Sequence, residues 1–378
     1  MLSSVSKPPP VQETAFLTKP APKDLFSDER GLSRVSALAA NPEGGWQVEL
    51  ARAFSNPRDL LTFLNLDPGQ ADESVSAQTS FSMRVPRPFA NRMVKGDPND
   101  PLLRQVLPVK DESTSFDGFL QDPLAEQSGP LPGMLHKYRS RVLLILRGGC
   151  AVNCRYCFRR HFPYGEHGLG RDEMAKIVDY IGKRPEINEV ILSGGDPLVA
   201  KDQQISDVFA SLATLPQLRR VRIHTRLPVV IPSRVTPTLV RLLGEAPWPT
   251  IVVLHTNHPQ EIDDALAGAT RDLREAGVTL LNQAVLLAGV NDTVETLSSL
   301  SERLFDIHVL PYYLHLLDKV EGAAHFDVSD AVARTLMAGL LERLPGFLVP
   351  RLVREVGGDR SKRPIDLNLP QRSFPGAQ

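Results

Sequence analysis

Residues 150–157 read Cys-Ala-Val-Asn-Cys-Arg-Tyr-Cys and contain all three cysteines of the chain, Cys150, Cys154 and Cys157. Three thiols this close together cannot form a disulfide framework, whereas thiolates gathered in one loop suit zinc or an iron–sulfur cluster. Structural zinc usually has four protein ligands, and His161 could supply the fourth. Buried, unreactive thiols are the simplest alternative. The loop therefore predicts a metal or cluster site, with zinc and iron–sulfur both open at this point.

From the apolar run directly before this loop to the C-terminal region, short apolar runs that predict β-strands alternate with amphipathic helical patterns. The candidate strands are 142–147, 189–193, 220–225, 250–256, 278–287 and 306–314. The candidate helices are 171–183, 201–214, 235–244, 259–275, 293–304 and 329–344. Six strand–helix alternations predict a parallel sheet of the α/β class, which a curved arrangement would close into a partial (β/α)6 barrel.

Polar and glycine-rich segments lie at the C-terminal ends of these candidate strands. They are 150–157, 194–197, 224–226, 255–258, 289–292 and 312–313. In barrel enzymes the C-terminal strand ends form the active site, so we expect these segments to meet there.

The regions outside the barrel differ in composition. Residues 1–30 are rich in Pro, Ser and Lys and are expected to be disordered or extended. Residues 31–135 are expected to form a helical and irregular collar, with a helical pattern over 46–64. The barrel is expected at 136–320 and a C-terminal segment at 321–378.

The 378 residues fit two domains or one large α/β barrel with extensions, and 43 Lys+Arg against 44 Asp+Glu leave a net charge of −1. Without a basic excess, the chain is not expected to be a general nucleic-acid or membrane-surface binder. Residues 1–13 contain no apolar run of signal-peptide length, and no aliphatic run in the sequence could span a bilayer. We therefore expect a cytoplasmic protein.

The Cys-x3-Cys-x2-Cys pattern after a first strand resembles the radical S-adenosylmethionine (SAM) superfamily. Its members bind three irons of a [4Fe–4S] cluster through three cysteines, and SAM chelates the fourth iron. The segment 193–197, Ser-Gly-Gly-Asp-Pro, resembles the superfamily's SAM-binding segment. This resemblance implies that Gly194 and Gly195 let the backbone approach SAM and that Asp196 meets the methionyl ammonium.

A closer resemblance, over about residues 81–369, is to the lysine 2,3-aminomutase family of isomerases. It rests on residues 141–144, 154–160, 255–259, 282–287, 289–292 and 311–313. Within that family, residues 46–66, 81–86 and 99–102 resemble the elongation factor P β-lysylation subfamily. The resemblance implies radical isomerisation of (S)-α-lysine to (R)-β-lysine, with SAM and pyridoxal 5′-phosphate (PLP), for attachment to elongation factor P.

The resemblance also implies roles for residues near PLP and SAM. Lys362 matches the lysine that carries PLP, although Asp359, Arg360 and Ser361 replace glycines of the family's loop. A lysine suits this role because desolvation and nearby cations can deprotonate its amine. Arg141 matches an arginine near PLP, and Lys137 and Tyr138 are further candidates there. Gln283, His255 and His224 are candidates on the SAM side.

Three residues are implied to bind the substrate lysine. Arg159 matches the arginine that pairs with its carboxylate, and Asp292 matches a carboxylate for its distant ammonium. Glu355 stands where the family has a second such aspartate, and its extra methylene is expected to shift the pocket or reduce its selectivity.

Two alternatives remain open on the sequence alone. The first is a stand-alone lysine 2,3-aminomutase of metabolism; such relatives often bind zinc at a subunit interface through C-terminal cysteines, which this sequence lacks. The second is a zinc-stabilised, non-catalytic binding module. For the favoured reading, L-lysine is the substrate, with a functional link to elongation factor P and its lysine ligase. Homo-oligomer formation is left open.

Overall fold

The structure is a computed structural model that describes residues 45–74, 81–127, 129–166 and 169–369. The expectation for residues 1–30 lies outside these ranges. All structural statements below concern the described residues.

A nine-stranded sheet organises the chain, and its strands lie side by side in sequence order. They are β1 (Met134–Tyr138), β2 (Arg141–Arg147), β3 (Glu189–Gly194), β4 (Arg220–Thr225), β5 (Thr250–Leu254), β6 (Thr279–Val285), β7 (Leu310–His315), β8 (Arg351–Arg354) and β9 (Arg363–Pro364). Strands β2 to β8 are parallel, whereas β1 and β9 pair antiparallel at the two edges. No pairing between described residues joins β1 to β9, so the barrel is partial, as predicted.

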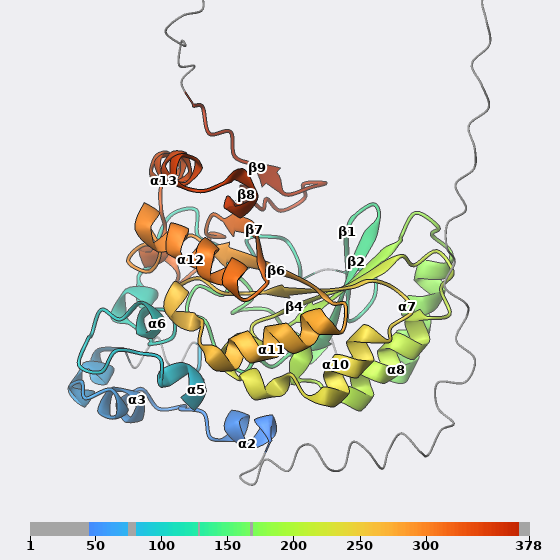
Figure 1. Cartoon of the computed structure of the whole chain (residues 1–378), viewed down its shortest axis with the longest axis horizontal. Coiled ribbons are helices and arrows are strands. Elements are labelled where there is room, and N and C mark those ends of the chain that lie inside the picture. The colour runs from blue at the N-terminus through green and yellow to red at the C-terminus, as the bar shows by residue number, and fades with distance from the viewer. Residues whose placement is uncertain (1–44, 75–80, 128, 167–168, 370–378) are drawn as a thin grey trace, which may run out of the picture. The chain divides into compact units, whose positions relative to one another are not determined.

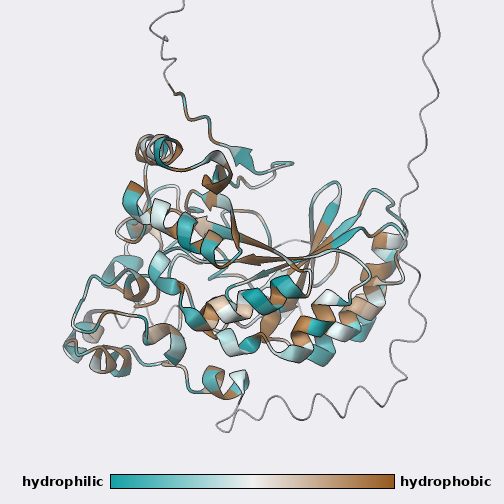
Figure 2. Ribbon diagram, viewed as in Figure 1, coloured by the Kyte–Doolittle hydropathy of each residue, from teal (hydrophilic) through white to brown (hydrophobic). Residues whose placement is uncertain are grey.

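Six helices connect the successive parallel strands and give six strand–helix units. They are α7 (Arg171–Gly182), α8 (Asp202–Leu212), α10 (Pro237–Gly244), α11 (Asp264–Glu275), α12 (Val294–Asp306) and α13 (Asp330–Arg343). Figure 1 shows α7, α8, α10 and α11 in a row along one side of the sheet. Hydrophobic and hydrophilic residues alternate along these helices in Figure 2; the buried residues of α7 are Met174, Ile177 and Ile181. The opposite face of the sheet is therefore the barrel interior.

Shorter elements surround this framework. The helices are α2 (Trp46–Ala51), α3 (Pro57–Phe63), α5 (Arg87–Ala90), α6 (Pro101–Arg104) and α9 (Leu227–Val230). The 3-10 turns are η1 (Pro68–Ser74), η2 (Lys110–Ser113), η3 (Tyr164–Glu166), η4 (Pro197–Val199), η5 (Pro232–Arg234), η6 (Pro259–Glu261), η7 (Ala324–Phe326) and η8 (Gly346–Leu348). Among the described helices, none combines the length and hydrophobicity that crossing a membrane requires.

The sequence pattern was wrong in several details. The helical pattern over 46–64 is two helices, because Pro57 begins α3 and Asn56 caps it by accepting from the Arg58 amide. Phe54, between them, pairs with Val85 in a β-bridge instead. The predicted strand over 306–314 begins only at Leu310, since α12 continues to Asp306. Strands β1, β8 and β9 were not predicted.

Candidate active site

The cysteine loop follows β2 and is held in place by contacts with the N-terminal collar. Arg155, between two of the cysteines, is fully buried, and its guanidinium donates to both carboxylate oxygens of Glu112 at 2.8 and 2.5 Å. Arg160 donates to the same carboxylate at 2.7 Å. Because Glu112 belongs to η2, a collar residue sets the position of the loop that carries the thiols.

The three thiols are free and half-buried. Burial and then the neighbouring sulfurs raise the pKa of Cys157 to about 11, and the same two causes raise the pKa of Cys150. Metal binding must therefore displace protons from these thiols. In the described ranges, no three His, Cys, Asp or Glu side chains converge to hold a single metal ion, and His161 does not complete such a group.

The glycines at 194 and 195 let β3 approach the cysteine loop. Gly194 has φ of +122°, and a Cβ on Gly195 would lie 2.5 Å from the Gly149 carbonyl oxygen. The Asp196 carboxylate accepts from the amides of Leu198, Arg226 and Leu227 and from the Thr225 hydroxyl, all at 2.7–3.0 Å. Asp196 thus joins two strand-end loops, and its predicted contact with the methionyl ammonium stays a prediction.

Lys362 lies on the hairpin between β8 and β9 and forms an ion pair with Glu355. The other oxygen of Glu355 accepts from Tyr138 at 3.0 Å and lies 3.4 Å from the Lys137 ammonium. Burial acts to raise the pKa of Glu355, but the ammonium groups of Lys362 and Lys137 outweigh it and lower the pKa to about 2. The predicted PLP lysine and the predicted substrate carboxylate are therefore direct neighbours.

Arg159 is buried and pairs with a carboxylate that the sequence analysis missed, Glu126. The Arg159 Nε donates to Glu126 at 2.6 Å, and its Nη1 donates to the Ser193 hydroxyl and the Gly194 carbonyl, both at 3.2 Å. The second oxygen of Glu126 lies 2.7 Å from the Lys137 ammonium. Burial opposes ionisation of Glu126, yet the charges of Arg159 and Lys137 lower its pKa. A chain of charges thus runs from Lys362 to the cysteine loop.

Polar side chains on the inner face of the barrel have buried atoms without a hydrogen-bond partner in the described structure. These atoms are His224 Nε2, His255 Nε2, Gln283 Oε1, His315 Nε2 and Asp318 Oδ1. Burial is the main cause that lowers the pKa of all three histidines, to about 3 for His255, and the charge of Lys362 contributes in each case. Such orphaned groups around Lys362 fit an interior that binds polar ligands.

Asp318 follows β7 and was not among the predicted residues. Burial and then the charge of Glu355 raise its pKa to about 7, whereas Lys362 and Lys137 act in the opposite direction. Asp292 is half-buried in the loop before α12, and no hydrogen bond or ion pair among the described residues joins it to this network. Asp318 is therefore near enough to Glu355 for the two charges to interact, and the role of Asp292 stays a prediction.

The remaining predicted residue, Arg141, is half-buried at the start of β2. Its guanidinium lies 4.1 Å from the centre of the Tyr138 ring. Arg141 and Lys362 lie at opposite edges of the sheet, and the contact of Tyr138 with Glu355 brings these two edges together. A phosphate group near Lys362 would meet this arginine and tyrosine, which suits the predicted PLP site.

The site residues that the sequence analysis did not select differ in whether a sequence signal could have identified them. Asp318 and His315 lie at or just beyond the C-terminal end of a predicted strand, so the strand-end argument that selected residues 312–313 could have included them. Glu126 lies in a segment without helical or strand periodicity, and no signal in the sequence could have selected it.

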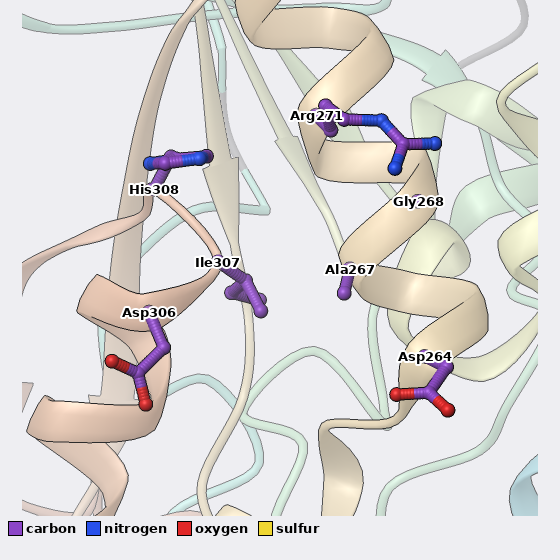
Figure 3. A pocket seen from close by; sticks show the side chains of 7 residues that line it. All are labelled: Asp264, Ala267, Gly268, Arg271, Asp306, Ile307 and His308. Atoms are coloured by element: carbon purple, nitrogen blue, oxygen red, sulfur yellow. The ribbon is translucent and has the colours of Figure 1, made fainter.

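A hollow of about 350 Å³ lies between α11 and the C-terminal end of α12 (Figure 3). Asp264, Arg271, Asp306 and His308 contribute its polar lining. None of the predicted site residues lines this hollow, and it belongs to the outer helical layer.

Comparisons with known proteins show which family the chain resembles. A model of the radical SAM superfamily matches residues 144–299. The chain is 50% identical over 345 residues to L-lysine 2,3-aminomutase of Escherichia coli (strain K12), covering 90% of this chain and 100% of that protein. It is 49% identical to the protein of that name from Haemophilus influenzae, with 85% and 95% covered. Identity to the one from Clostridium subterminale is 33%, with 85% and 77% covered.

Proposed function

Because the chain belongs to the L-lysine 2,3-aminomutase family of radical SAM proteins, we propose that it isomerises (S)-α-lysine to (R)-β-lysine. The observation that carries this proposal is that Lys362 and the cysteine loop flank one interior. His255 lies close enough to Arg159, Arg226 and Lys362 for the charges of all three to lower its pKa. A radical formed at the cysteine loop would thus arise beside a substrate held at Lys362.

The cysteine loop would bind the [4Fe–4S] cluster, Gln283 and His255 would approach SAM, and Lys362 would carry PLP with Arg141 and Tyr138 near its phosphate. When bound, these groups supply a 5′-deoxyadenosyl radical that takes a hydrogen atom from the substrate and an acceptor for the migrating amino group. The histidines of the interior are neutral at physiological pH because burial lowers their pKa values. They therefore add no positive charge that would repel the substrate ammonium.

Arg159 is proposed to bind the substrate carboxylate. Glu126 and the Ser193 and Gly194 oxygens hold Nε and Nη1 of its guanidinium, so the orientation of the side chain is set before substrate arrives. A fixed guanidinium pairs with a carboxylate at a low entropic cost. The role of Glu126 is to hold this donor in place.

Glu355 and Asp318 are proposed to bind the distant ammonium of lysine. In the free chain Lys362 neutralises Glu355. If Lys362 carries PLP, its amine would no longer neutralise Glu355, and Lys137 would be the remaining cation beside that carboxylate. The unpartnered oxygen of Asp318 supplies a second acceptor nearby. Two carboxylates favour a lysine substrate over an acidic amino acid, whose side chain would be repelled.

We also propose that the β-lysine serves the modification of elongation factor P. The resemblance of residues 46–66, 81–86 and 99–102 to that subfamily supports this role. The ligase that attaches lysine to the factor would be the functional partner.

The test of the isomerase activity is anaerobic. The chain is reconstituted with iron and sulfide and supplied with SAM, PLP, dithionite and L-lysine, and β-lysine is measured by chromatography. Formation of (R)-β-lysine is expected. Cleavage of SAM without any change in lysine would retain the radical chemistry and reject the substrate pocket.

The test of the wider role adds elongation factor P and its lysine ligase to the same reaction. The factor is expected to gain the mass of β-lysine only when this chain is active. If the ligase uses the product no better than α-lysine, the stand-alone metabolic alternative is favoured.

A further inference from the structure

Arg226 follows β4 directly, and the proposed reaction gives it no role. Its guanidinium is buried, and Nη1 donates to the Cys154 Sγ at 2.8 Å. The same group donates to the Tyr156 hydroxyl within the cysteine loop. A permanent cation therefore touches one of the three sulfurs predicted to bind the cluster.

The position of this guanidinium is fixed on its other side. Nη2 donates to the Gln105 amide oxygen at 2.7 Å and to the Glu261 carboxylate at 3.0 Å. Glu261 is fully buried and also accepts from the amides of Asn257 and His258, at 2.9 and 3.1 Å. Moreover, the Arg226 amide donates to Asp196, so backbone and side chain are both held. Arg226 cannot turn away from Cys154 without leaving buried groups unpaired.

A donor in this position changes the energetics of electron uptake. Reduction of a [4Fe–4S] cluster from the 2+ to the 1+ state adds one negative charge, which is shared with the cysteine sulfurs. A hydrogen bond and a positive charge at a sulfur stabilise the reduced state more than the oxidised state, and burial strengthens this effect. Glu261 opposes it, because its negative charge lies on the far side of the same guanidinium.

We propose that Arg226 is a positioning residue that raises the reduction potential of the [4Fe–4S] cluster through its hydrogen bond to Cys154, with Glu261 as the opposing charge. The proposal rests on the three cysteines being the cluster ligands. It concerns the uptake of one electron from a low-potential donor and requires no lysine turnover.

The test is a potentiometric titration, followed by the electron paramagnetic resonance signal of the reduced cluster. The full chain is reconstituted anaerobically, without SAM or lysine, and dithionite is the reductant. Arg226→Gln is expected to keep iron and sulfide at the wild-type content and to shift the midpoint at least 59 mV more negative, which is a tenfold change for one electron. The midpoint of Arg226→Lys is expected to lie between those of the wild type and Arg226→Gln, because lysine keeps the charge but not the planar guanidinium.

Arg234→Gln is the matched control. Arg234 is also fully buried, but it donates to the carbonyl oxygens of Leu198 and Ala200 and pairs with Asp202, away from the sulfurs. Its loss is expected to leave the midpoint unchanged. An equal shift in this control would mean that general loosening, rather than the contact with Cys154, sets the potential.

Glu261→Gln tests the proposal independently if Arg226→Gln does not fold. Removal of the opposing charge is expected to shift the midpoint more positive, opposite in sign to the loss of Arg226. An unchanged midpoint in whichever of the two variants binds a full cluster overturns the proposal. Failure of the wild-type chain to bind iron would instead reject the cluster assignment and with it the proposed function.

Discussion

At the scale of single residues, Lys362 and Glu355 neutralise each other in the free chain, seven residues apart. Lys362→Ala is expected to abolish the visible absorbance of bound PLP and reduce β-lysine formation to background, because Lys137, the other amine beside Glu355, is held by Glu126 at 2.7 Å. The cluster absorbance is expected to remain, since the cysteine loop does not contact Lys362. Absorbance spectra and the β-lysine assay measure both effects.

Lys319→Ala is the matched control for that variant. Lys319 is a more exposed lysine of the same region, with a side chain 51% exposed. It is expected to keep both cofactors and full turnover. Retained turnover in Lys362→Ala, or its loss in Lys319→Ala, would contradict the assignment of Lys362.

Asp318 predicts a pH dependence. Its pKa is raised to about 7, by burial and then Glu355, against the opposing charges of Lys362 and Lys137. The carboxyl group is therefore neutral below about pH 7 and ionised above it, and only the ionised form attracts the substrate ammonium. The KM for lysine is expected to fall between pH 6 and 8.

Asp318→Asn is expected to remove this pH dependence and to raise KM by about 10- to 100-fold, the loss of one hydrogen bond to a charged group. Asp292→Asn is the comparison, because Asp292 is the carboxylate that the sequence predicted to bind the substrate ammonium. A larger rise in KM for Asp292→Asn than for Asp318→Asn would restore the residue chosen from the sequence.

At the scale of elements, the end of β3 packs on the cysteine loop through glycine. A Cβ on Gly195 would lie 2.5 and 2.7 Å from the carbonyl oxygens of Gly149 and Gly148. Gly195→Ala is thus expected to displace the loop, at a cost of about 1–3 kcal/mol, and to lower the iron bound per chain. Thermal unfolding and iron analysis measure the two effects.

Gly182→Ala provides the comparison for that change. A Cβ there would make an ordinary contact with Leu215 at 3.8 Å near the end of α7. Iron content is expected to stay at the wild-type value, with stability unchanged or raised by about 0.5–1 kcal/mol. If both alanines lower iron equally, the close packing of β3 on the loop is not what holds the thiols.

The elements that the sequence predicted are those with a long periodic signal. Helix α7 and strand β4 appear within one residue of the expected bounds, because their apolar spacing is set by burial on one side. Strand β9 has two residues, Arg363 and Pro364, and owes its existence to pairing with β8. Glu126 could not be predicted from the sequence for a similar reason. Its partner Arg159 is 33 residues away, and only the folded chain brings the two together.

At the scale of the whole molecule, Glu112 connects the collar to the barrel. Its carboxylate is fully buried between Arg155 and Arg160. Glu112→Ala is expected to destabilise the chain by roughly 3–5 kcal/mol, because it leaves buried guanidinium groups without their partner. Denaturant unfolding measures this loss, and iron content is expected to fall with it.

Asp111→Ala is the neighbouring control. Asp111 is exposed, and its removal is expected to change stability by less than about 0.5 kcal/mol. Equal stability of the two variants would mean that the collar does not hold the cysteine loop.

The contact between Arg226 and Cys154 spans 72 residues of sequence. A ribosome adds about 5–20 residues per second, so a nascent chain carries its thiols for roughly 4–14 seconds before Arg226 has even been made. Thiols without their folded surroundings are open to oxidation during that interval. The contact with Arg226 can therefore form only after synthesis has passed residue 226, so the thiols are made before this part of their surroundings exists.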